Sequence, residues 1–172
     1  KEKIGDYIFG YGEEDLESVI GDILRKNNLT LSVAESCTGG RISSRIVSVP
    51  GSSEYYIGGV CSYSNELKMS LLGVKKETLE RFGAVSSETA VEMAEGIRKL
   101  TDSDVSISTT GIAGPDGGTA EKPVGLVWIG LSDKNNSFAM KFLFGDNREI
   151  NIQRSSQRAL EILRRHLLNI KI

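Results

Sequence analysis

The sequence predicts an α/β protein: a three-layer α/β/α sandwich with a mixed, mostly parallel sheet between the helices. Three observations lead to this prediction. Apolar segments with helical spacing alternate along the chain with short strand-like runs. A late pair of strands, 124–131 and 138–144, is joined by the turn-forming segment Asp133–Asn136. The length of 172 residues suits one domain with a sizeable core.

The first part of the chain predicts two helices and two strands. Between Glu13 and Lys26, apolar residues recur at helical spacing, with acids in the first turn and basic residues in the last, as the helix dipole favours. Leu31–Ala34 has the composition of a short strand, and Arg41–Val49 is amphipathic like a helix. The run Tyr55–Tyr63 predicts a second strand, in which Gly58–Gly59 indicates a bulge or a close backbone approach.

The second part is predicted to be richer in helix. Residues 66–72 and 75–82 form short helices, each followed by a glycine that ends it. A longer helix is capped by Ser86 or Ser87 and runs to Leu100. Val105–Thr109 alternates between apolar and polar residues, as a half-buried strand does, and the last helix covers 148–168.

Composition and charge narrow the classes of function. The net charge of −2 provides no basic surface for nucleic acid, no apolar run reaches membrane-spanning length, and no signal peptide is recognisable. We expect the two cysteines, Cys37 and Cys61, to be reduced thiols rather than a disulfide. With the single histidine, His166, they provide too few ligands for a Cys/His zinc site. A Ser-His or Cys-His hydrolase would require His166 to reach the site. We therefore expect a cytoplasmic protein without a metal, cofactor, nucleic-acid or membrane partner.

The stretch L-S-V-A-E-S-C-T-G-G, Leu31 to Gly40, is a strand, a tight polar turn and the start of a helix. Such a turn presents a side chain at the carboxyl end of a strand, where α/β sheets usually bind ligands, so Ser36 is a candidate nucleophile. The amides near Thr38, Gly39 and Gly40 are candidate donors to an oxyanion or a phosphate. The alternative is an ordinary helix start at which Ser and Thr act only as caps.

Tyr63 and Lys68 are expected at the same edge of the sheet as Ser36. Tyr63 closes a predicted strand, and Lys68 lies in the first turn of the next helix, where the helix dipole disfavours a positive charge. A neutral lysine amine can accept the proton of a serine hydroxyl, and Tyr63 would relay that proton or orient the amine. The alternative is a solvated surface lysine beside a core tyrosine.

The most glycine-dense loop of the chain is Gly111–Gly118, which follows a predicted strand. Its many amides and lack of side chains suit a phosphate or a closely approaching ligand, although neither the dinucleotide motif nor the P-loop motif is present. A plain connection between two strands is the alternative. Arg148, at the start of the last helix, is placed to bind a phosphate, or to pair with Asp146 or Glu149.

Six motifs occur in a fixed order and spacing. They are A-E-S-C-T-G-G (34–40), P-G-S-S (50–53), Y-S-N-E-x-K (63–68), G-A-V-S (83–86), T-G-I-A-G-P-D-G-G (110–118) and E-K-P-V-G (121–125). Together they resemble the CinA C-terminal domain family. The resemblance runs from about Leu16 to the end of the chain, and the combination of motifs makes it specific.

The family includes nicotinamide-nucleotide amidases. These enzymes hydrolyse the carboxamide of nicotinamide mononucleotide to give nicotinate mononucleotide and ammonia, without a metal. The resemblance implies Ser36 as nucleophile, Lys68 as base and Tyr63 as an assisting group. Glu35 would offset the pyridinium charge or bind backbone amides. The substrate-binding residues expected on this basis are Glu35, Thr38, Gly39, Gly40, Thr110, Gly111, Gly114, Gly117 and Arg148.

The extent of the domain and its assembly give further expectations. Residues 1–12 are predicted to be a linker remnant or an edge strand, and 13–172 the amidase domain. The chain begins at Lys1, and the resemblance implies a preceding domain similar to molybdopterin-binding proteins. Family members commonly read G-D-R at the start of the last helix, whereas here Asn147 precedes Arg148. Exposed hairpins in such a sheet favour a homodimer.

Three other functions are compatible with parts of the sequence. One is a non-catalytic nucleotide-binding module that serves an attached N-terminal domain. Another is a partner protein in competence or DNA damage, as the family name suggests, although the balanced charge argues against direct DNA binding. The third is a cysteine amidase that uses Cys37, for which no histidine is obviously placed as an activator.

Overall fold

Five strands form one mixed sheet in the order β2-β1-β3-β4-β5. The computed structural model describes residues 15–171, so the predicted linker or edge strand over 1–12 lies outside the described residues. Four strands run in the same direction and β4 runs against them, which confirms the mixed, mostly parallel sheet. The strands are β1 (Leu31–Glu35), β2 (Tyr56–Cys61), β3 (Val105–Gly111), β4 (Leu126–Ser132) and β5 (Ser137–Leu143).

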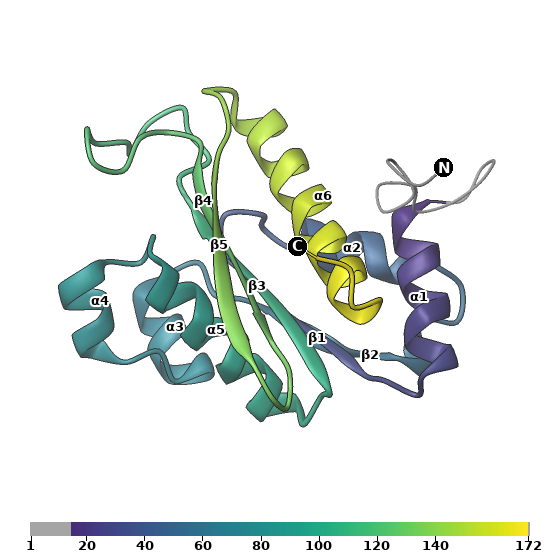
Figure 1. Ribbon diagram of the computed structural model, residues 1–172. Helices are drawn as coiled ribbons and strands as arrows, with labels where there is room; N and C mark the ends of the chain where they lie inside the picture. The colour runs from purple at the N-terminus through teal and green to yellow at the C-terminus, as the bar shows by residue number, and fades with distance from the viewer. Residues whose placement is uncertain (1–14, 172) are drawn as a thin grey trace.

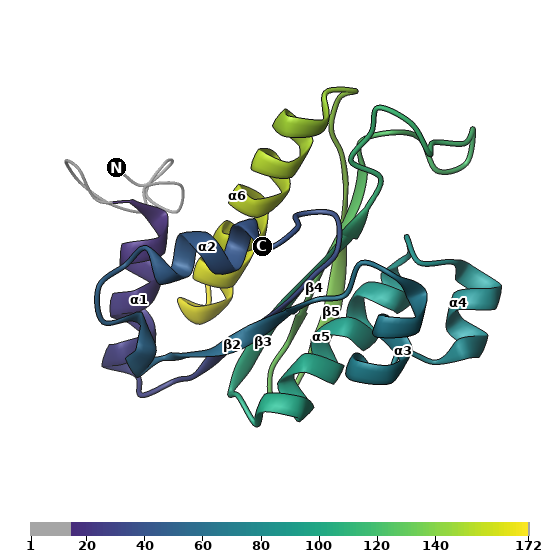
Figure 2. The same ribbon diagram turned by 180° about the vertical axis from the view of Figure 1, so that it is seen from behind.

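Helices cover both faces of the sheet, which confirms the predicted three-layer sandwich (Figures 1 and 2). One layer contains α1 (Leu16–Lys26), α2 (Arg41–Val47) and α6 (Arg148–Leu167). The other contains α3 (Asn65–Leu72), α4 (Lys76–Phe82) and α5 (Ser87–Thr101). No helix within residues 15–171 is both long enough and apolar enough to cross a membrane.

Local sequence explains where several helices start and stop. The side chains of Asp15, Ser64 and Ser86 each accept a hydrogen bond from a backbone amide in the first turn of the helix that follows, at the starts of α1, α3 and α5. The predicted helix over 41–49 ends at Val47, two residues early, because Pro50 disfavours helical backbone at the residue before it. After Pro50 and Gly51, Ser52–Glu54 forms a short 3₁₀ helix.

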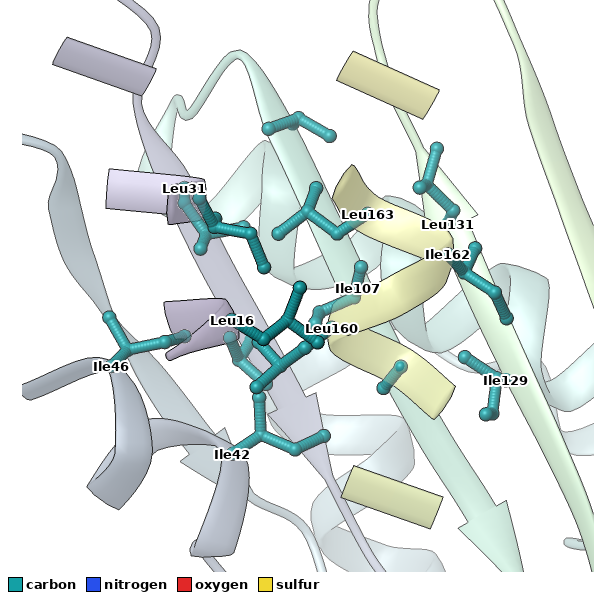
Figure 3. Packing of buried hydrophobic residues seen from close by; sticks show 14 of the residues in the cluster. Leu16, Leu31, Ile42, Ile46, Ile107, Ile129, Leu131, Leu160, Ile162 and Leu163 are labelled. Atoms are coloured by element: carbon teal, nitrogen blue, oxygen red, sulfur yellow. The ribbon is translucent and has the colours of Figure 1, made fainter. Parts of the chain in front are cut away.

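The larger apolar core lies between the sheet and the layer of α1, α2 and α6 (Figure 3). Leu160 and Leu163 of α6 are fully buried with Ile107 of β3 and Ile129 of β4. Leu160 and Leu163 are three positions apart in the helix, and the buried residues Val127, Ile129 and Leu131 of β4 are two apart, which is how each element presents one apolar face. The packing fixes the start of α6 near the end of the sheet where β1 and β3 finish.

On the opposite face, small residues let α5 lie directly on the strands. The hydroxyl of Ser106 donates to the carbonyl of Ala94 at 2.7 Å, and that of Ser108 donates to the carbonyl of Ala90 at 2.6 Å. Gly96 of α5 lies against the end of α3, where an added Cβ would be 1.8 Å from the carbonyl oxygen of Leu72. Because α3 carries Lys68, this contact sets the position of the lysine relative to the sheet.

Gly96→Ala is therefore expected to destabilise the protein. The new methyl group would meet backbone rather than a flexible side chain, so α3 must move. We expect a loss of at least about 2 kcal/mol in the free energy of unfolding, measured in urea, despite a gain of up to about 1 kcal/mol in helix propensity.

The matched control for this prediction is Gly21→Ala, in the middle of α1. It brings the same gain in helix propensity, but its Cβ would meet the hydroxyl end of the Tyr55 side chain. Equal stability of the two variants would show that the contact between Gly96 and Leu72 does not limit the packing.

Candidate active site

Ser36 lies immediately after β1, at the carboxyl end of the parallel strands. Its amide donates to the carbonyl of Thr109 on β3 at 3.0 Å, so the turn begins as a continuation of the sheet. Gly39 and Gly40 follow with φ of +61° and +93°, a backbone that suits glycine, and α2 starts at Arg41. The strand, turn and helix start predicted for this segment are confirmed.

Lys68 reaches Ser36 from the first turn of α3. Its Nζ lies 3.2 Å from Oγ of Ser36, and the lysine side chain is almost completely buried, with a relative exposure of 1%. Nζ also donates to the carbonyl of Ser62 at 2.7 Å and approaches the carbonyl of Tyr63 at 3.5 Å. The Ser62 carbonyl is held in turn because the Ser62 amide donates to the carbonyl of Glu35 at 2.8 Å.

The surroundings of Lys68 favour its neutral form. Burial lowers the pKa of Lys68 below its ordinary value of 10.5, and the nearby thiols of Cys37 and Cys61 oppose only part of that effect. Within residues 15–171, Lys68 forms no ion pair with a carboxylate that would stabilise the ammonium. An amine with a lowered pKa beside a hydroxyl can act as a general base toward that hydroxyl.

Glu35 is fully buried, and its carboxylate caps the start of α2. One oxygen accepts from the amides of Gly40 and Ile42 at 3.0 and 3.1 Å, and the other accepts from the amide and hydroxyl of Ser43 at 2.9 and 2.7 Å. Both oxygens are therefore bound within the protein. Of the two roles expected for Glu35, this geometry corresponds to the binding of backbone amides, which fixes the turn that carries Ser36.

The amides of the turn divide into bound and available donors. The Gly39 amide donates to the carbonyl of Ser36 at 3.2 Å, and the Gly40 amide donates to Glu35. Within the part of the chain that the structure describes, the amide of Thr38 has no acceptor, and the amide of Cys37 contacts only the thiol of the same residue. The hydroxyl of Thr38 is hydrogen-bonded to that of Thr109 at 2.7 Å, which ties the turn to β3.

A cavity of about 220 Å³ opens above Ser36 and Lys68. Six of the predicted site residues line it, together with four that sequence reasoning did not assign to the site and Cys37, which it considered only as an alternative nucleophile. The predicted residues are Ser36, Tyr63, Lys68, Thr110, Gly111 and Arg148. The others are Asn65, Ala84, Val85 and Ala113.

The four unassigned residues all lie within motifs that were recognised, so motif membership was the available signal. Asn65 belongs to the motif 63–68, Ala84 and Val85 to 83–86, and Ala113 to 110–118. The carbonyl of Ala84 accepts from the hydroxyl of Thr110 at 2.7 Å, which holds this wall of the cavity against the end of β3. Thr110 is itself fully buried, so its hydroxyl serves the wall.

Tyr63 lies at the rim of the cavity with a relative exposure of 65%. Its hydroxyl accepts from Nη2 of Arg148 at 3.3 Å, whereas Lys68 approaches only its backbone carbonyl. Nη1 of Arg148 donates to the carbonyl of Gly114 at 2.8 Å. The structure therefore places the Tyr63 side chain with Arg148 and the glycine loop rather than in hydrogen-bonding contact with the serine–lysine pair.

The predicted glycines of the loop occupy different places. Gly111 lines the cavity, and a Cβ there would lie 2.7 Å from the carbonyl oxygen of Leu126. Gly114 has a φ of +90° and offers its carbonyl to Arg148. Gly117 also has a positive φ, but it is exposed and is not part of the cavity lining.

Cys37 and His166 do not form a nucleophile and its activator. Burial raises the pKa of the Cys37 thiol to about 12, so the thiol stays protonated at neutral pH. Nε2 of His166 lies 2.7 Å from a carboxylate oxygen of Asp133, just beyond the end of β4. That end of β4 pairs with Ser106 at the start of β3, the opposite edge of the sheet from Ser36.

The fold and the site define an α/β domain in which a buried lysine amine contacts a serine hydroxyl at the carboxyl edge of parallel strands. The chain belongs to the CinA C-terminal domain family, whose model matches residues 13–167. This confirms the resemblance identified from the motifs.

Curated relatives of the chain are longer proteins. A CinA-like protein of Kosmotoga olearia is 52% identical over 168 residues, which cover 98% of this chain and 41% of that protein. A CinA-like protein of Thermotoga neapolitana is 51% identical over 166 residues, covering 96% of this chain and 40% of that protein. The chain therefore spans about two fifths of the length of the curated relatives that it matches.

Solved structures of similar proteins share the fold over nearly their whole length. The crystal structure of competence/damage inducible protein CihA from Agrobacterium tumefaciens is 38% identical with a TM-score of 0.82, and the match covers 90% of this chain and 96% of that one. Competence damage-inducible protein A from Klebsiella pneumoniae is 30% identical with a TM-score of 0.87, covering 91% and 97%.

Proposed function

We propose that this domain is a serine amidohydrolase that converts nicotinamide mononucleotide and water to nicotinate mononucleotide and ammonia. The observation that carries the proposal is the buried Nζ of Lys68 at 3.2 Å from Oγ of Ser36. Membership of the CinA C-terminal domain family supports the choice of substrate, because the motifs of this chain resemble those of the nicotinamide-nucleotide amidases in that family.

In the proposed acylation step, Oγ of Ser36 attacks the carboxamide carbon while the neutral amine of Lys68 accepts the hydroxyl proton. The amides of Cys37 and Thr38, which donate to no other residue within residues 15–171, are the donors that we propose for the oxyanion. Lys68 then gives the proton to the departing nitrogen, and ammonia leaves an acyl ester on Ser36.

In the second step, water attacks the acyl ester. Lys68 accepts a proton from this water and returns it to Oγ of Ser36, which releases the nicotinate product and restores the starting state. Glu35 has no part in either proton transfer, because its carboxylate holds the amides at the start of α2. Its proposed role is to keep the turn and the nucleophile rigid.

Arg148 is proposed to bind the phosphate at the mouth of the cavity. Its hydrogen-bond partners are neutral, the Gly114 carbonyl and the Tyr63 hydroxyl, and within residues 15–171 it forms no ion pair. A cavity of about 220 Å³ is smaller than the roughly 300–1,000 Å³ typical of drug-sized ligand sites, so we place the pyridine ring inside and the phosphate at the rim. Tyr63 is proposed to position Arg148.

We also propose a cytoplasmic homodimer that forms one part of a longer protein. The free thiols of Cys37 and Cys61 support a reducing compartment, and the greater length of the curated relatives supports a further domain. β5 is an edge strand with a hydrogen-bonded neighbour on one side only, so its free side is available to pair with a second copy of the chain.

The testing experiment is ammonia release from nicotinamide mononucleotide by the purified chain in the presence of a chelator. We expect one nicotinate mononucleotide per ammonia, with much slower turnover of the nucleoside that lacks the phosphate. Relatives of the chain are called competence/damage-inducible proteins, and the alternative that we consider is a non-catalytic nucleotide-binding domain of such a protein. Binding of the mononucleotide without ammonia release would support that alternative and contradict the amidase.

A further inference from the structure

Asn151 joins the two loops that flank Arg148. It lies in the first turn of α6 with a relative exposure of 1%. Its Nδ2 donates to the carbonyl of Ala113, in the glycine loop after β3, and to the carbonyl of Gly145, in the loop after β5, each at 2.9 Å. A single buried carboxamide therefore ties both connections to the same helix.

The contacts of Asn151 and Arg148 fall on adjacent carbonyls of the same loop. Asn151 binds the Ala113 carbonyl, and Arg148, three residues earlier on α6, binds the Gly114 carbonyl. Residues three apart on a helix share a face, so the two side chains hold the loop together. Ala113 also lines the cavity above Ser36. The position of this loop therefore determines both the cavity wall and the place of the Arg148 guanidinium.

The start of α6 is itself rigid. The side chain of Asn147 accepts from the amide of Ile150 at 3.0 Å, and the Asn151 amide donates to the Asn147 carbonyl at 2.9 Å. Asn151 is thus a fixed point on which the two loops can be aligned.

The other end of the carboxamide has no partner. Oδ1 of Asn151 is buried and accepts no hydrogen bond within the described residues. An unpaired buried acceptor is unfavourable, so the two donated hydrogen bonds are what this side chain contributes. An aliphatic residue here would leave the carbonyls of Ala113 and Gly145 without these donors.

We infer that Asn151 is a positioning residue that aligns Arg148 for the phosphate of the substrate, and so makes the site selective for nucleotides over nucleosides. This inference rests on the proposed function for its substrate. Asn151 acts through the glycine loop, which receives its hydrogen bond next to the carbonyl that holds Arg148. The serine lies in the turn after β1 and the lysine on α3, and the Asn151 side chain binds neither segment.

The test is performed by titration calorimetry in a Ser36→Ala background, with nicotinamide mononucleotide and its nucleoside as probes. We expect Asn151→Ala to weaken mononucleotide binding about tenfold or more and to change nucleoside binding less than threefold. Asn151→Leu keeps a side chain of similar size without a donor or a charge, so it should give the same loss of selectivity if Asn151→Ala folds poorly.

Ser156→Ala is the matched control, because its buried hydroxyl donates only to the carbonyl of Ile152 within α6. It should leave the ratio of the two affinities unchanged. In the catalytically competent chain, the Asn151 variants should raise KM for the mononucleotide about tenfold and leave kcat within about threefold. An unchanged affinity ratio in both Asn151 variants would overturn the inference, even if the protein releases ammonia.

The calorimetric binding measurements test this inference separately from the proposed activity. If the wild-type chain binds the mononucleotide but releases no ammonia, the amidase is wrong, and the affinity ratios of the Asn151 variants still decide the role of Asn151. If the mononucleotide does not bind at all, both proposals are overturned.

Discussion

Ser36→Ala is expected to lower kcat for nicotinamide mononucleotide by about 10⁴-fold or more and to leave its binding unchanged. The variant removes the hydroxyl that Lys68 contacts at 3.2 Å, and with it the proposed acyl intermediate. The side chain contributes little to the fold, because the turn is held by the Ser36 backbone, by Glu35 and by Thr38. Ammonia release and calorimetric binding measure the two halves of the prediction.

Cys37→Ala is the matched control for this prediction. It changes the neighbouring side chain of the same turn, and the raised pKa of the buried thiol, about 12, predicts that it takes no part as a thiolate. We expect its activity to stay within about threefold of the wild type after correction for stability. Retained activity in Ser36→Ala together with loss in Cys37→Ala would instead identify the cysteine as the nucleophile.

Lys68→Met is expected to lower kcat/KM by about 10³-fold, within the range that general base catalysis contributes. In the wild type, the active form of Lys68 is the neutral amine, and burial lowers its pKa below 10.5. Activity should therefore rise with pH through that lowered pKa and level off below pH 10.5. The residual activity of Lys68→Met should lack this ascending limb.

The same lowered pKa has a consequence for stability. Since folding disfavours the ammonium of Lys68, the unfolded chain binds this proton more tightly than the folded one. The free energy of unfolding of the wild type should increase as pH rises from the folded-state pKa of Lys68 toward 10.5, and this contribution is absent at lower pH. Lys68→Met should lose that increase, which urea unfolding at several pH values would detect.

Lys68→Arg is the control for charge at this position. A guanidinium remains protonated at every accessible pH and cannot accept the serine proton, so the variant should be inactive across the pH range. If Lys68→Arg were active, or if the wild type showed no ascending limb below pH 10.5, Lys68 would not be the base.

Much of the fold was predictable because it depends on patterns within short segments. Helix spacing between Glu13 and Lys26, and the turn at Asp133–Asn136, each specify a local structure that the packed protein retains. The helix after Tyr63 was also placed well, since Ser64 caps it as local sequence predicts. The identity of Ser36 and Lys68 as candidates came from their places at the ends of such elements.

The candidate site was less predictable where the role of a residue depends on the direction of its side chain. Glu35 was expected to face either the ligand or backbone amides, and its direction depends on how tightly α2 follows the turn. The Tyr63 side chain lies beside Arg148, from which 85 positions of sequence separate it. Asn151 belongs to no motif that was recognised, and its two loop contacts arise only when α6 packs on the sheet.

The sequence by itself determined the order of helices and strands, the turn that carries Ser36 and the family of the domain. These follow from residue spacing, caps and glycines, which act over a few neighbouring positions. Only the tertiary structure decided that the Lys68 amine is buried against Ser36 and that the Glu35 carboxylate is occupied at α2. The physical reason is that the burial and the hydrogen-bond partners of a side chain are set by elements distant in sequence. Because these elements pack closely, each buried polar group has only the partners that the fold supplies.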